Sequence, residues 1–243
     1  MRYAILSDIH SNLEAFSAVL ESIASEKPDA IICLGDIVGY GASPKECLDL
    51  VRSHCHHIVA GNHDHAVLGL TNKEFFNPNA KKAVEWTAQK LSTEDLDFLK
   101  GLPVCLEMNN LVATHATLNK PTEWGYILDE YEADACFSFM KPQNRVTFIG
   151  HSHIPLAFEN GPLVRFLGFI THLEMNPSYQ YVVNVGSVGQ PRDGINLASY
   201  ALYDSKNLTV DLIRTSYDIK TAQKKILDAG LPSFLAERIQ YGR

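Results

Sequence analysis

The feature that most constrains this chain is a series of short apolar runs, each followed by carboxylate, amide or imidazole side chains. The first run, Tyr3–Leu6, leads into Asp8 and His10. Four polar fragments follow in order: Gly35-Asp36, Gly61-Asn62-His63-Asp64, His115 and Gly150-His151-Ser152-His153. Functional groups of α/β proteins gather at the carboxyl ends of parallel strands. The order therefore predicts that these fragments meet at one edge of a sheet.

The first sixty residues alternate between strand and helix patterns. We expect strands at Arg2–Ser7, Ala30–Leu34 and His57–Ala60, and helices at Asn12–Ser25 and from Pro44 to about Arg52. A proline in the first turn suits the second helix, because it has no amide hydrogen to lose there. This alternation predicts βαβ units and a parallel sheet, and thus the α/β class.

After Gly101 the pattern changes to short strands. Two helices, Asn79–Leu91 and Glu94–Lys100, are expected before this point, and one, about Glu130–Phe139, is expected within the strands. The expected strands are Val104–Glu107, Leu111–Thr114, Val146–Ile149, Leu163–Leu167, Tyr181–Val185, Tyr200–Tyr203 and Leu208–Ile213. Helices near Ile219–Asp228 and Pro232–Gln240 close the chain. Because polar fragments lie in both halves, we expect one domain over residues 1–243.

The charge balance limits the class of partner. The chain has 21 Lys and Arg against 28 Asp and Glu, a formal net charge of −7. This argues against electrostatic capture of a nucleic acid polymer or of an anionic membrane. It does not exclude a small phosphate ester, since bound cations can reverse the local sign of a site. The pattern leaves the oligomeric state open.

The cysteines indicate a reducing compartment. They are odd in number and scattered, with no Cys-x-x-Cys pair: Cys33, Cys47, Cys55, Cys105 and Cys136. We interpret them as reduced thiols. The chain enters a strand at once without a signal-peptide pattern, and no apolar stretch approaches the length needed to cross a bilayer. We therefore expect a soluble cytoplasmic protein.

The polar fragments form a ligand set rich in nitrogen and oxygen and free of sulfur. Asp8 and His10 are two residues apart, so on an extended chain both side chains leave the same side and can reach one cation. Asp36 has two carboxylate oxygens and can bridge two cations. The remaining donors are Asn62, His115, His151 and His153. This set fits Mn²⁺, Fe, Co²⁺, Ni²⁺ or Zn²⁺ better than Ca²⁺ or Mg²⁺, and predicts a two-metal hydrolytic centre.

In this order the fragments resemble the signature of the calcineurin-like metallophosphoesterases, D-x-H, GD, GNH[DE], H and GHxH. Every element is present between Asp8 and His153. The narrower match is to the small prokaryotic branch of phosphodiesterases and diadenosine-tetraphosphatase-like proteins, and it rests on Gly35–Gly41 and Asn184–Ser187. The resemblance implies a four-layer α/β/β/α sandwich of two mixed sheets flanked by helices, with a cap helix within residues 117–142.

The resemblance also implies a role for each matched residue. One metal would be held by Asp8, His10, Asp36 and His153, and the other by Asp36, Asn62, His115 and His151. A metal-bound hydroxide would attack phosphorus in line. His63 would act as the general acid that protonates the leaving oxygen, with Asp64 orienting its ring. Of the candidate metals we place Mn²⁺ first, with Fe, Ni, Co and Zn as alternatives.

Other residues are candidates for contact with the substrate, which we expect to be a small phosphorylated molecule such as a nucleotide. Tyr40 lies within the narrower match. Arg192 could clamp a phosphate with two hydrogen bonds, or could form a structural ion pair with Asp193 or another acid. Trp124 and Tyr126 could stack on a nucleobase or serve only in packing.

Several single features have plainer interpretations. The fragment Gly61–Asp64 alone could be a hairpin turn. The histidines of the run Ser53–His57 lie at the start of a strand, away from the ligands, so we expect a solvated turn. For His65 we weigh two alternatives equally. Its side chain contacts the substrate or a metal ligand, or it has no role in the site. We expect His172 to be a surface residue in an irregular stretch.

Two other functions remain open from sequence. A serine/threonine protein phosphatase of the same superfamily would carry Asp-Arg-Gly where this chain has Gly39-Tyr40-Gly41, and Glu in place of Asp64. A catalytically silent scaffold, such as the retromer subunit of this fold, would lack the catalytic histidine that this chain keeps at position 63. Ala116 stands where relatives often have Gly, which would narrow the approach to the second metal. We expect a phosphoesterase for phosphodiesters or dinucleoside polyphosphates.

Overall fold

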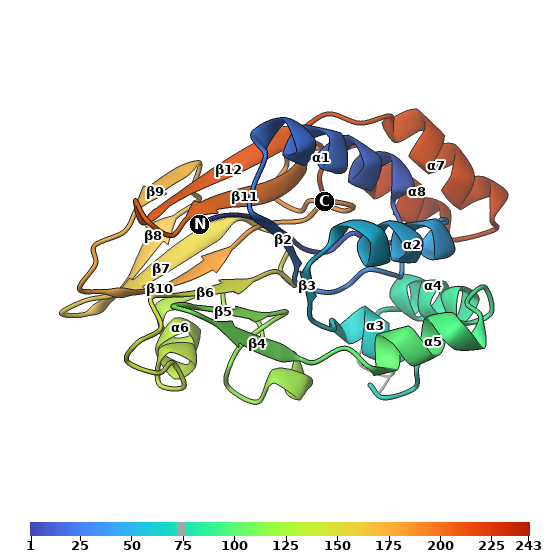
Figure 1. Ribbon diagram of the computed structural model, residues 1–243. Coiled ribbons are helices and arrows are strands. Elements are labelled where there is room, and N and C mark those ends of the chain that lie inside the picture. The colour runs from blue at the N-terminus through green and yellow to red at the C-terminus, as the bar shows by residue number, and fades with distance from the viewer. Residues whose placement is uncertain (72–75) are drawn as a thin grey trace.

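Two mixed six-stranded sheets lie at the centre of the computed structural model, which describes residues 1–71 and 76–243 (Figure 1). The first sheet contains, in spatial order, β3 (His57–Ile58), β2 (Ala30–Cys33), β1 (Arg2–Leu6), β11 (Ala198–Asp204), β12 (Thr209–Thr215) and β9 (His172–Glu174). The second contains β4 (Cys105–Met108), β5 (Leu111–Thr114), β6 (Val146–Ile149), β10 (Gln180–Asn184), β7 (Leu156–Asn160) and β8 (Val164–Gly168).

Parallel strands occupy the part of each sheet that matters for the site. In the first sheet β1, β2 and β3 are parallel, and in the second β5, β6 and β10 are parallel. The other pairings are antiparallel. The carboxyl ends of the parallel strands therefore lie together at one edge of each sheet.

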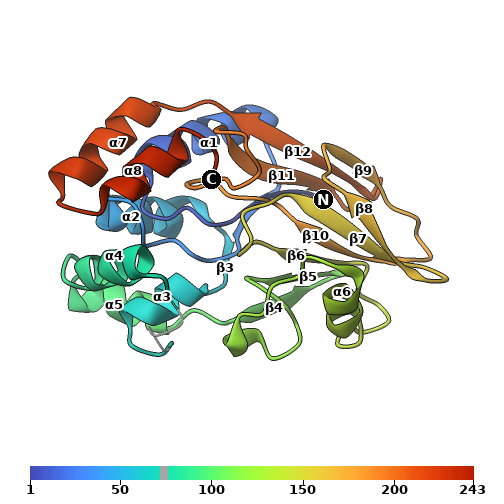
Figure 2. The ribbon, with the colours of Figure 1, turned by 180° about the vertical axis from the view of Figure 1, so that it is seen from behind.

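Helices cover the outer faces of both sheets. On the first sheet lie α1 (Leu13–Glu26) and α2 (Pro44–His54). Two further helices, α7 (Ile219–Asp228) and α8 (Ser233–Ile239), pack against each other, and α7 packs against α1 (Figure 2). On the second lies α6 (Glu130–Phe137), packed against β7, β8 and β10. Near the strand ends lie α3 (Asn62–Val67), α4 (Pro78–Ala88), α5 (Thr93–Lys100) and the short 3-10 helix η2 (Pro121–Glu123). The expected four-layer α/β/β/α sandwich is confirmed.

The core explains why the strands are continuous apolar runs in the sequence. In β1, Tyr3 and Ile5 face the space between the sheets, where Ile5 joins Phe148 and Tyr203. Ala4 belongs instead to the cluster beneath the helices of the first sheet. A strand that buries both faces needs apolar residues at every position. The sandwich thus arises from two cores on either side of one sheet.

Most predicted elements are found within a few residues of their expected bounds. The cap expected at Asn12 is confirmed, because its side chain accepts a hydrogen bond from the amide of Ala15. The structure also contains α3, β7 and β9, none of which we predicted. His172 is a surface residue as expected, but it lies in β9 and not in an irregular stretch. Among the described residues, no helix combines the length and apolar character needed to cross a bilayer.

Candidate metal centre

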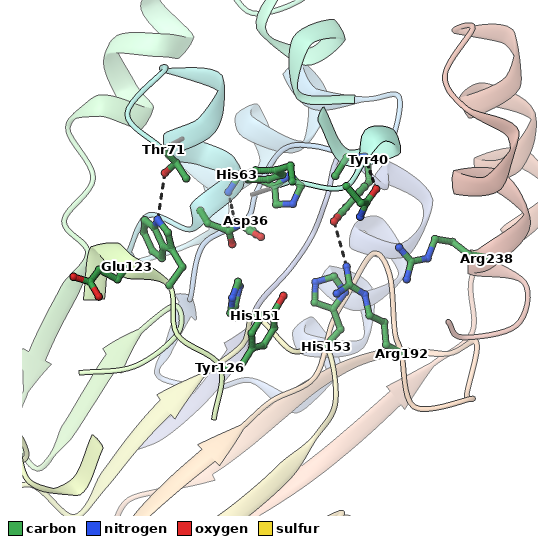
Figure 3. A pocket seen from close by; sticks show the side chains of 15 residues that line it. Asp36, Tyr40, His63, Thr71, Glu123, Tyr126, His151, His153, Arg192 and Arg238 are labelled. Atoms are coloured by element: carbon green, nitrogen blue, oxygen red, sulfur yellow. Dashed lines mark hydrogen bonds between the residues drawn. The ribbon is translucent and has the colours of Figure 1, made fainter. Parts of the chain in front are cut away.

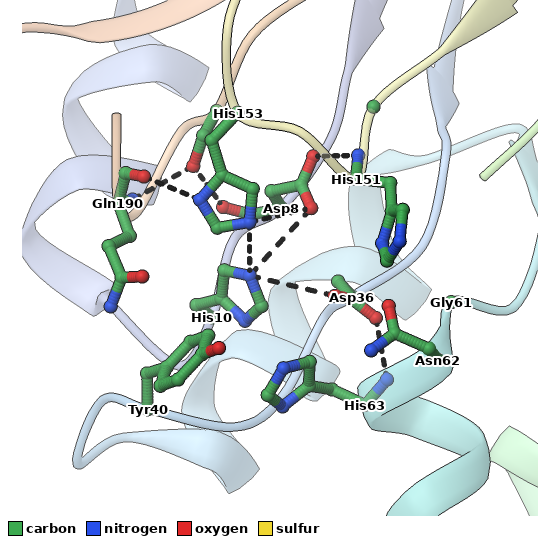
Figure 4. Close-up of polar contacts among 12 residues, drawn as sticks. Asp8, His10, Asp36, Tyr40, Gly61, Asn62, His63, His151, His153 and Gln190 are labelled. Atoms are coloured by element: carbon green, nitrogen blue, oxygen red, sulfur yellow. Dashed lines mark hydrogen bonds and ion pairs between the residues drawn. The ribbon is translucent and has the colours of Figure 1, made fainter. Parts of the chain in front are cut away.

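The candidate ligands lie at the carboxyl ends of the parallel strands of both sheets, in loops or, for Asn62, at the first residue of α3 (Figure 4). The first sheet supplies ligands from the loops that follow β1, β2 and β3, and the second supplies them from those that follow β5 and β6. Six of the seven expected ligands are buried, and the side chain of Asn62 is half-buried. The seven are Asp8, His10, Asp36, Asn62, His115, His151 and His153. The structure brings all of them into one cluster.

A first group consists of Asp8, His10 and His153, whose donor atoms lie within 4.8 Å of one another. The Nε2 atoms of His10 and His153 are 3.0 Å apart. The Oδ1 atom of Asp8 lies 3.2 Å from Nε2 of His153 and 3.7 Å from Nε2 of His10. One oxygen and two nitrogen donors therefore face a common point.

A second group consists of Asp36, His115 and His151, also within 4.8 Å. The Nε2 atom of His115 lies 3.0 Å from Oδ1 of Asn62, which adds an amide oxygen to this group. The Nε2 atom of His151 is buried and has no hydrogen-bond partner among the described residues. This group thus offers two nitrogen and two oxygen donors.

Asp36 lies between the two groups. Its Oδ2 atom is 3.6 Å from Nε2 of His10 and 3.4 Å from Nε2 of His115. Its Oδ1 atom accepts a hydrogen bond of 2.8 Å from the amide of His63, which fixes the orientation of the carboxylate. A single carboxylate is therefore in position to serve both groups.

Backbone contacts determine which nitrogen each imidazole turns toward the centre. The Nδ1 atom of His10 is 3.2 Å from the carbonyl oxygen of Val38, and that of His153 is 2.6 Å from the carbonyl oxygen of Gln190. A carbonyl only accepts, so each Nδ1 must carry the hydrogen and each Nε2 a lone pair. The two lone pairs then face each other. This acceptor-to-acceptor geometry fits a cation between them.

The ring of His115 follows the same pattern, with Nδ1 at 2.9 Å from the carbonyl oxygen of Leu34. Burial alone would lower its pKa, but the Asp36 carboxylate raises the pKa to about 9. The site therefore attracts a positive charge at Nε2 of His115. The Nε2 atom of His151 and the Oδ1 atom of Asp8 have no hydrogen-bond partner within the described ranges, and together with His115 this donor set fits two divalent cations.

The carboxylates of the cluster are held in the charged form. Burial would raise the pKa of Asp8, but the His153 and His115 rings hold it well below its usual range. The pKa of Asp36 is lowered in the same way, chiefly by the His115 and His63 rings, against the effect of burial. Both candidate ligands are therefore anionic at neutral pH.

Five of the seven candidate ligands have a left-handed backbone: Asp8 (φ 56°), His10 (φ 50°), Asp36 (φ 51°), His151 (φ 65°) and His153 (φ 62°). The expectation that Asp8 and His10 converge because their chain is extended is wrong. The tight turns after β1 and β6 direct these side chains inward instead. For residues other than glycine such angles cost on the order of 1 kcal/mol or more each, and they concentrate at functional sites.

Asp64 does not orient the ring of His63 as expected. Its carboxylate accepts hydrogen bonds from the backbone amides of Ile37 (3.0 Å), Val38 (3.3 Å) and Gly61 (2.9 Å). The reason is that Asn62–Val67 forms helix α3, not a hairpin turn, and consecutive helical side chains point about 100° apart. Asp64 therefore joins the loop that carries Asp36 to the start of α3.

His63 faces the cavity beside the ligands. Its ring centroid lies 4.9 Å from that of His10 and 4.4 Å from that of Tyr40, and its buried Nδ1 atom has no hydrogen-bond partner in the described part of the chain. Burial is the main cause that lowers the pKa of His63 to about 4. The Asp36 carboxylate opposes this shift, and the positive charge of Arg192 adds to it. Its ring is neutral at neutral pH in the protein alone.

A cavity of about 290 Å³ opens over the cluster (Figure 3). Its floor includes Asp36, His151 and His153. On one wall the ring of Tyr126 stacks on that of His151, with centroids 4.2 Å apart. Trp124 lies on the same wall, where its Nε1 donates a hydrogen bond of 3.2 Å to Oγ1 of Thr71. Helix α6 of the expected cap segment packs against the second sheet. The part of the segment that reaches the cavity is the chain before α6, which carries Trp124 and Tyr126.

The opposite wall carries positive charge. Arg192 lines the cavity, and its Nη2 lies 3.4 Å from the hydroxyl of Tyr40. The alternative that Arg192 pairs with Asp193 is wrong, because Asp193 forms its ion pair with Arg214. Arg238 of α8 also lines the cavity, and sequence reasoning did not find it. No motif or spacing connects this residue of a plain amphipathic helix with the ligand loops.

The remaining histidines lie outside the ligand cluster. His65 is half-buried, and its ring meets that of Trp124 edge-on at 5.1 Å, so it supports the aromatic wall. In the histidine run, Nδ1 of His56 accepts a hydrogen bond from the amide of Ile31. This contact lies near the start of β2, at the end opposite the ligands.

Comparison with known proteins gives a consistent result. The family model described as "Calcineurin-like phosphoesterase superfamily domain" matches residues 1–208. The uncharacterized protein MJ0912 of Methanocaldococcus jannaschii is 42% identical over 99% of this chain and 98% of its own length. Phosphodiesterase YfcE of Escherichia coli is 26% identical over 86% of this chain and 91% of its own. The crystal structure of a metallophosphoesterase from Sphaerobacter thermophilus superposes with a TM-score of 0.88 at 35% identity, covering 100% and 99% of the two chains.

Proposed function

The chain belongs to the calcineurin-like phosphoesterase superfamily, and on this premise we propose that it hydrolyses small phosphate esters, in particular phosphodiesters or dinucleoside polyphosphates. The observation that carries the proposal is the position of Asp36, whose Oδ2 lies within 3.6 Å of one imidazole from each ligand group. A bridging carboxylate between two nitrogen-rich groups is the arrangement that a two-metal hydrolase requires.

Two divalent cations, when bound, would lower the pKa of a water molecule and offset negative charge on the phosphate oxygens. One would be held by Asp8, His10, Asp36 and His153, and the other by Asp36, Asn62, His115 and His151. Mn²⁺ is our first choice, with Fe, Co²⁺, Ni²⁺ and Zn²⁺ as alternatives that the same donors accept. Five left-handed backbone positions already hold ligands in place.

We assign to His63 the transfer of a proton to the leaving oxygen. Its ring lines the cavity next to Asp36, and one of its ring nitrogens lies within 4.8 Å of a carboxylate oxygen of Asp36. Because the pKa of the ring is about 4 in the protein alone, the ring must take up its proton from solvent when the substrate binds, since the negative charge of the substrate raises the pKa of the ring. Asp64 supports this step indirectly, since it fixes the first turn of α3 on which His63 lies.

The cavity favours a small substrate over a phosphorylated protein. Trp124 and Tyr126 on one wall offer aromatic faces on which a base or another planar group could stack. The arginine that grips phosphate in the protein phosphatases is replaced by Tyr40 in Gly39-Tyr40-Gly41. A relative that covers most of this chain is named a phosphodiesterase. A scaffold without activity would not need His63 at this place. We propose that the hydrolysis of phosphate esters by this protein takes place in the cytoplasm.

The proposal is tested with bis(p-nitrophenyl) phosphate and the purified protein loaded in turn with each candidate metal. We expect turnover with at least one metal, and about 10²–10⁴-fold slower turnover in His63→Ala with the metal content unchanged. His172→Ala, which removes an exposed imidazole, is the matched control. Absence of turnover with every divalent metal would favour the scaffold, and faster hydrolysis of phosphopeptides would favour a protein phosphatase.

A further inference from the structure

Two guanidinium groups face one end of the cavity above the ligand cluster (Figure 3). Arg192 comes from the loop between β10 and β11, and Arg238 comes from helix α8. Tyr40 lies beside them and lines the same cavity. Helix α8 is outside residues 1–208, the part of the chain that the family model matches. The pairing of these two arginines is therefore not part of the ligand signature.

Neither arginine has an acidic side chain within ion-pair distance, as far as the described residues go. Arg192 donates from Nη2 to Oε1 of Gln190 at 2.9 Å, and its guanidinium carbon lies 5.8 Å from the ring centre of Tyr40. Arg238 donates from Nε to the main-chain oxygen of Arg243, and its guanidinium carbon lies 5.3 Å from the ring centre of Phe234. These contacts orient both groups.

The two positive charges are close enough to act on each other. Burial, and next the charge of Arg192, lower the pKa of Arg238 to about 10, so the side chain remains charged at neutral pH. The Nε atom of Arg192 is buried and has no hydrogen-bond partner in residues 1–71 and 76–243. Two like charges that line one end of a cavity are stabilised by an anion between them.

We propose that Arg192 and Arg238 form a second anion subsite, which holds a phosphate group of the substrate other than the one that is attacked at the ligand cluster. The substrate then carries neighbouring phosphate groups, as in a phosphate chain. This inference rests on the proposed function and deepens it, because the ligand cluster and the two arginines line one cavity of about 290 Å³. Arg192 and Arg238 act as specificity-determining residues.

The test measures binding of inorganic orthophosphate and inorganic tripolyphosphate to the metal-free protein by isothermal titration calorimetry. Metal-free protein is used because tripolyphosphate would otherwise bind free metal. We expect the wild type to prefer tripolyphosphate, and Arg238→Gln and Arg192→Gln each to reduce the ratio of the two affinities by about tenfold. Arg2→Gln is the matched control, because Arg2 lies at the opposite end of β1 and pairs with Glu26.

An unchanged affinity ratio in Arg238→Gln would overturn the second subsite. Thermal unfolding shows whether this variant is folded, and Arg238→Met, which keeps the aliphatic stem over Phe234, replaces it if it is not. Turnover of bis(p-nitrophenyl) phosphate by the wild type is measured in parallel. Turnover with an unchanged ratio would refute only the subsite, whereas a reduced ratio without turnover would refute only the proposed function.

Discussion

At the scale of single residues, the site depends on contacts that lie behind the ligands. Three imidazoles each donate their Nδ1 hydrogen to a backbone carbonyl. The pairs are His10 with Val38, His115 with Leu34 and His153 with Gln190. These bonds keep the rings from turning away and leave Nε2 of His10 and His153 free for a cation. At His115 they leave Nε2 as the position where a cation would displace the proton that its raised pKa retains. The donor atoms are therefore oriented before any ligand arrives, and the strain of their backbone is borne by the folded protein as a whole.

One consequence is a dependence of stability on pH in the metal-free protein. Burial, and next the charge of His115, lower the pKa of His151 to about 3, whereas an unfolded chain has a histidine pKa near 6.5. Between these values the unfolded chain binds a proton that the native ring does not, so the free energy of unfolding falls as the pH falls. From pH 6.5 to 4.5 this one ring removes about 2 kcal/mol.

We expect His151→Gln to lose about 2 kcal/mol less than the wild type over that interval, measured by urea unfolding in the presence of EDTA. The control is His172→Gln. Asp211 raises the pKa of exposed His172, so the stability that this imidazole contributes to the folded protein is lost as the pH rises and not as it falls. If His151→Gln lost as much stability in acid as the wild type, the native ring would have to be protonated.

The identity of most site residues could be predicted because their chemistry is specific. Asp, Asn and His after short apolar runs suggest ligands whatever the detailed backbone angles are. The contacts of Asp64 could not be predicted, since they depend on Asn62–Val67 being helical. Arg238 could not be predicted either, because only the packing of α8 brings it to the cavity. Sequence thus identifies groups with a chemical signature and misses those placed by tertiary structure alone.

At the scale of elements, close backbone contacts hold the ligand loops together. A side-chain carbon at Gly61 would overlap the carboxylate and the backbone amide of Asp36, and one at Gly150 would overlap Ser7 and Asp8. These glycines allow loops from different strands to approach more closely than any other residue permits. Asp64 then joins two of the loops through three backbone hydrogen bonds.

We therefore expect Gly61→Ala to displace Asp36 and to weaken the metal centre. The added carbon forces backbone shifts that typically cost about 1–3 kcal/mol of folding free energy. We also expect at least tenfold weaker Mn²⁺ binding, because the carboxylate between the two groups moves. Binding is measured by calorimetry and stability by chemical unfolding. In the control Gly101→Ala the added carbon meets its neighbours at ordinary distances of 3.5 Å or more. Equal metal affinity in both variants would contradict the argument.

Two of the elements that sequence did not reveal, α3 and β9, are short and depend on tertiary contacts. Helix α3 has six residues, of which the first four, Asn62–His65, have low helix propensity, and the bonds of Asp36 to His63 and of Asp64 to Gly61 hold its first turn. Strand β9 has three residues and exists through its pairing with β12. Longer elements with a clear period, such as α1, were predicted because their own residues determine them.

At the scale of the whole molecule, the site lies where the two sheets meet. Asp8, Asp36 and Asn62 come from the first sheet, and His115, His151 and His153 come from the second. The packing of one sheet on the other followed from the family resemblance, since no local pattern shows which strands share a sheet. Sequence did indicate that both halves must converge, because the ligand fragments are divided between them.

A cation bound by both sheets should stabilise the whole fold. Only the native state brings these ligands together, so a metal at 100 times its dissociation constant adds about 2.7 kcal/mol of unfolding free energy for one site. For a chain of this length that corresponds to a rise in Tm of roughly 5–10 °C. We expect this shift when Mn²⁺ is added to EDTA-treated protein in a calorimetric scan.

Asp36→Asn tests whether the two groups act together. Its carboxylate lies within 3.6 Å of both His10 and His115, so replacing it weakens both sites at once, and most of the Mn²⁺ shift should disappear. Asp49→Asn, which removes an exposed carboxylate from α2, should keep the full shift. A shift in Asp36→Asn equal to that of the wild type would mean that Mn²⁺ stabilises the protein from elsewhere. In that case Asp36 could not be the residue through which the two sheets share their cations.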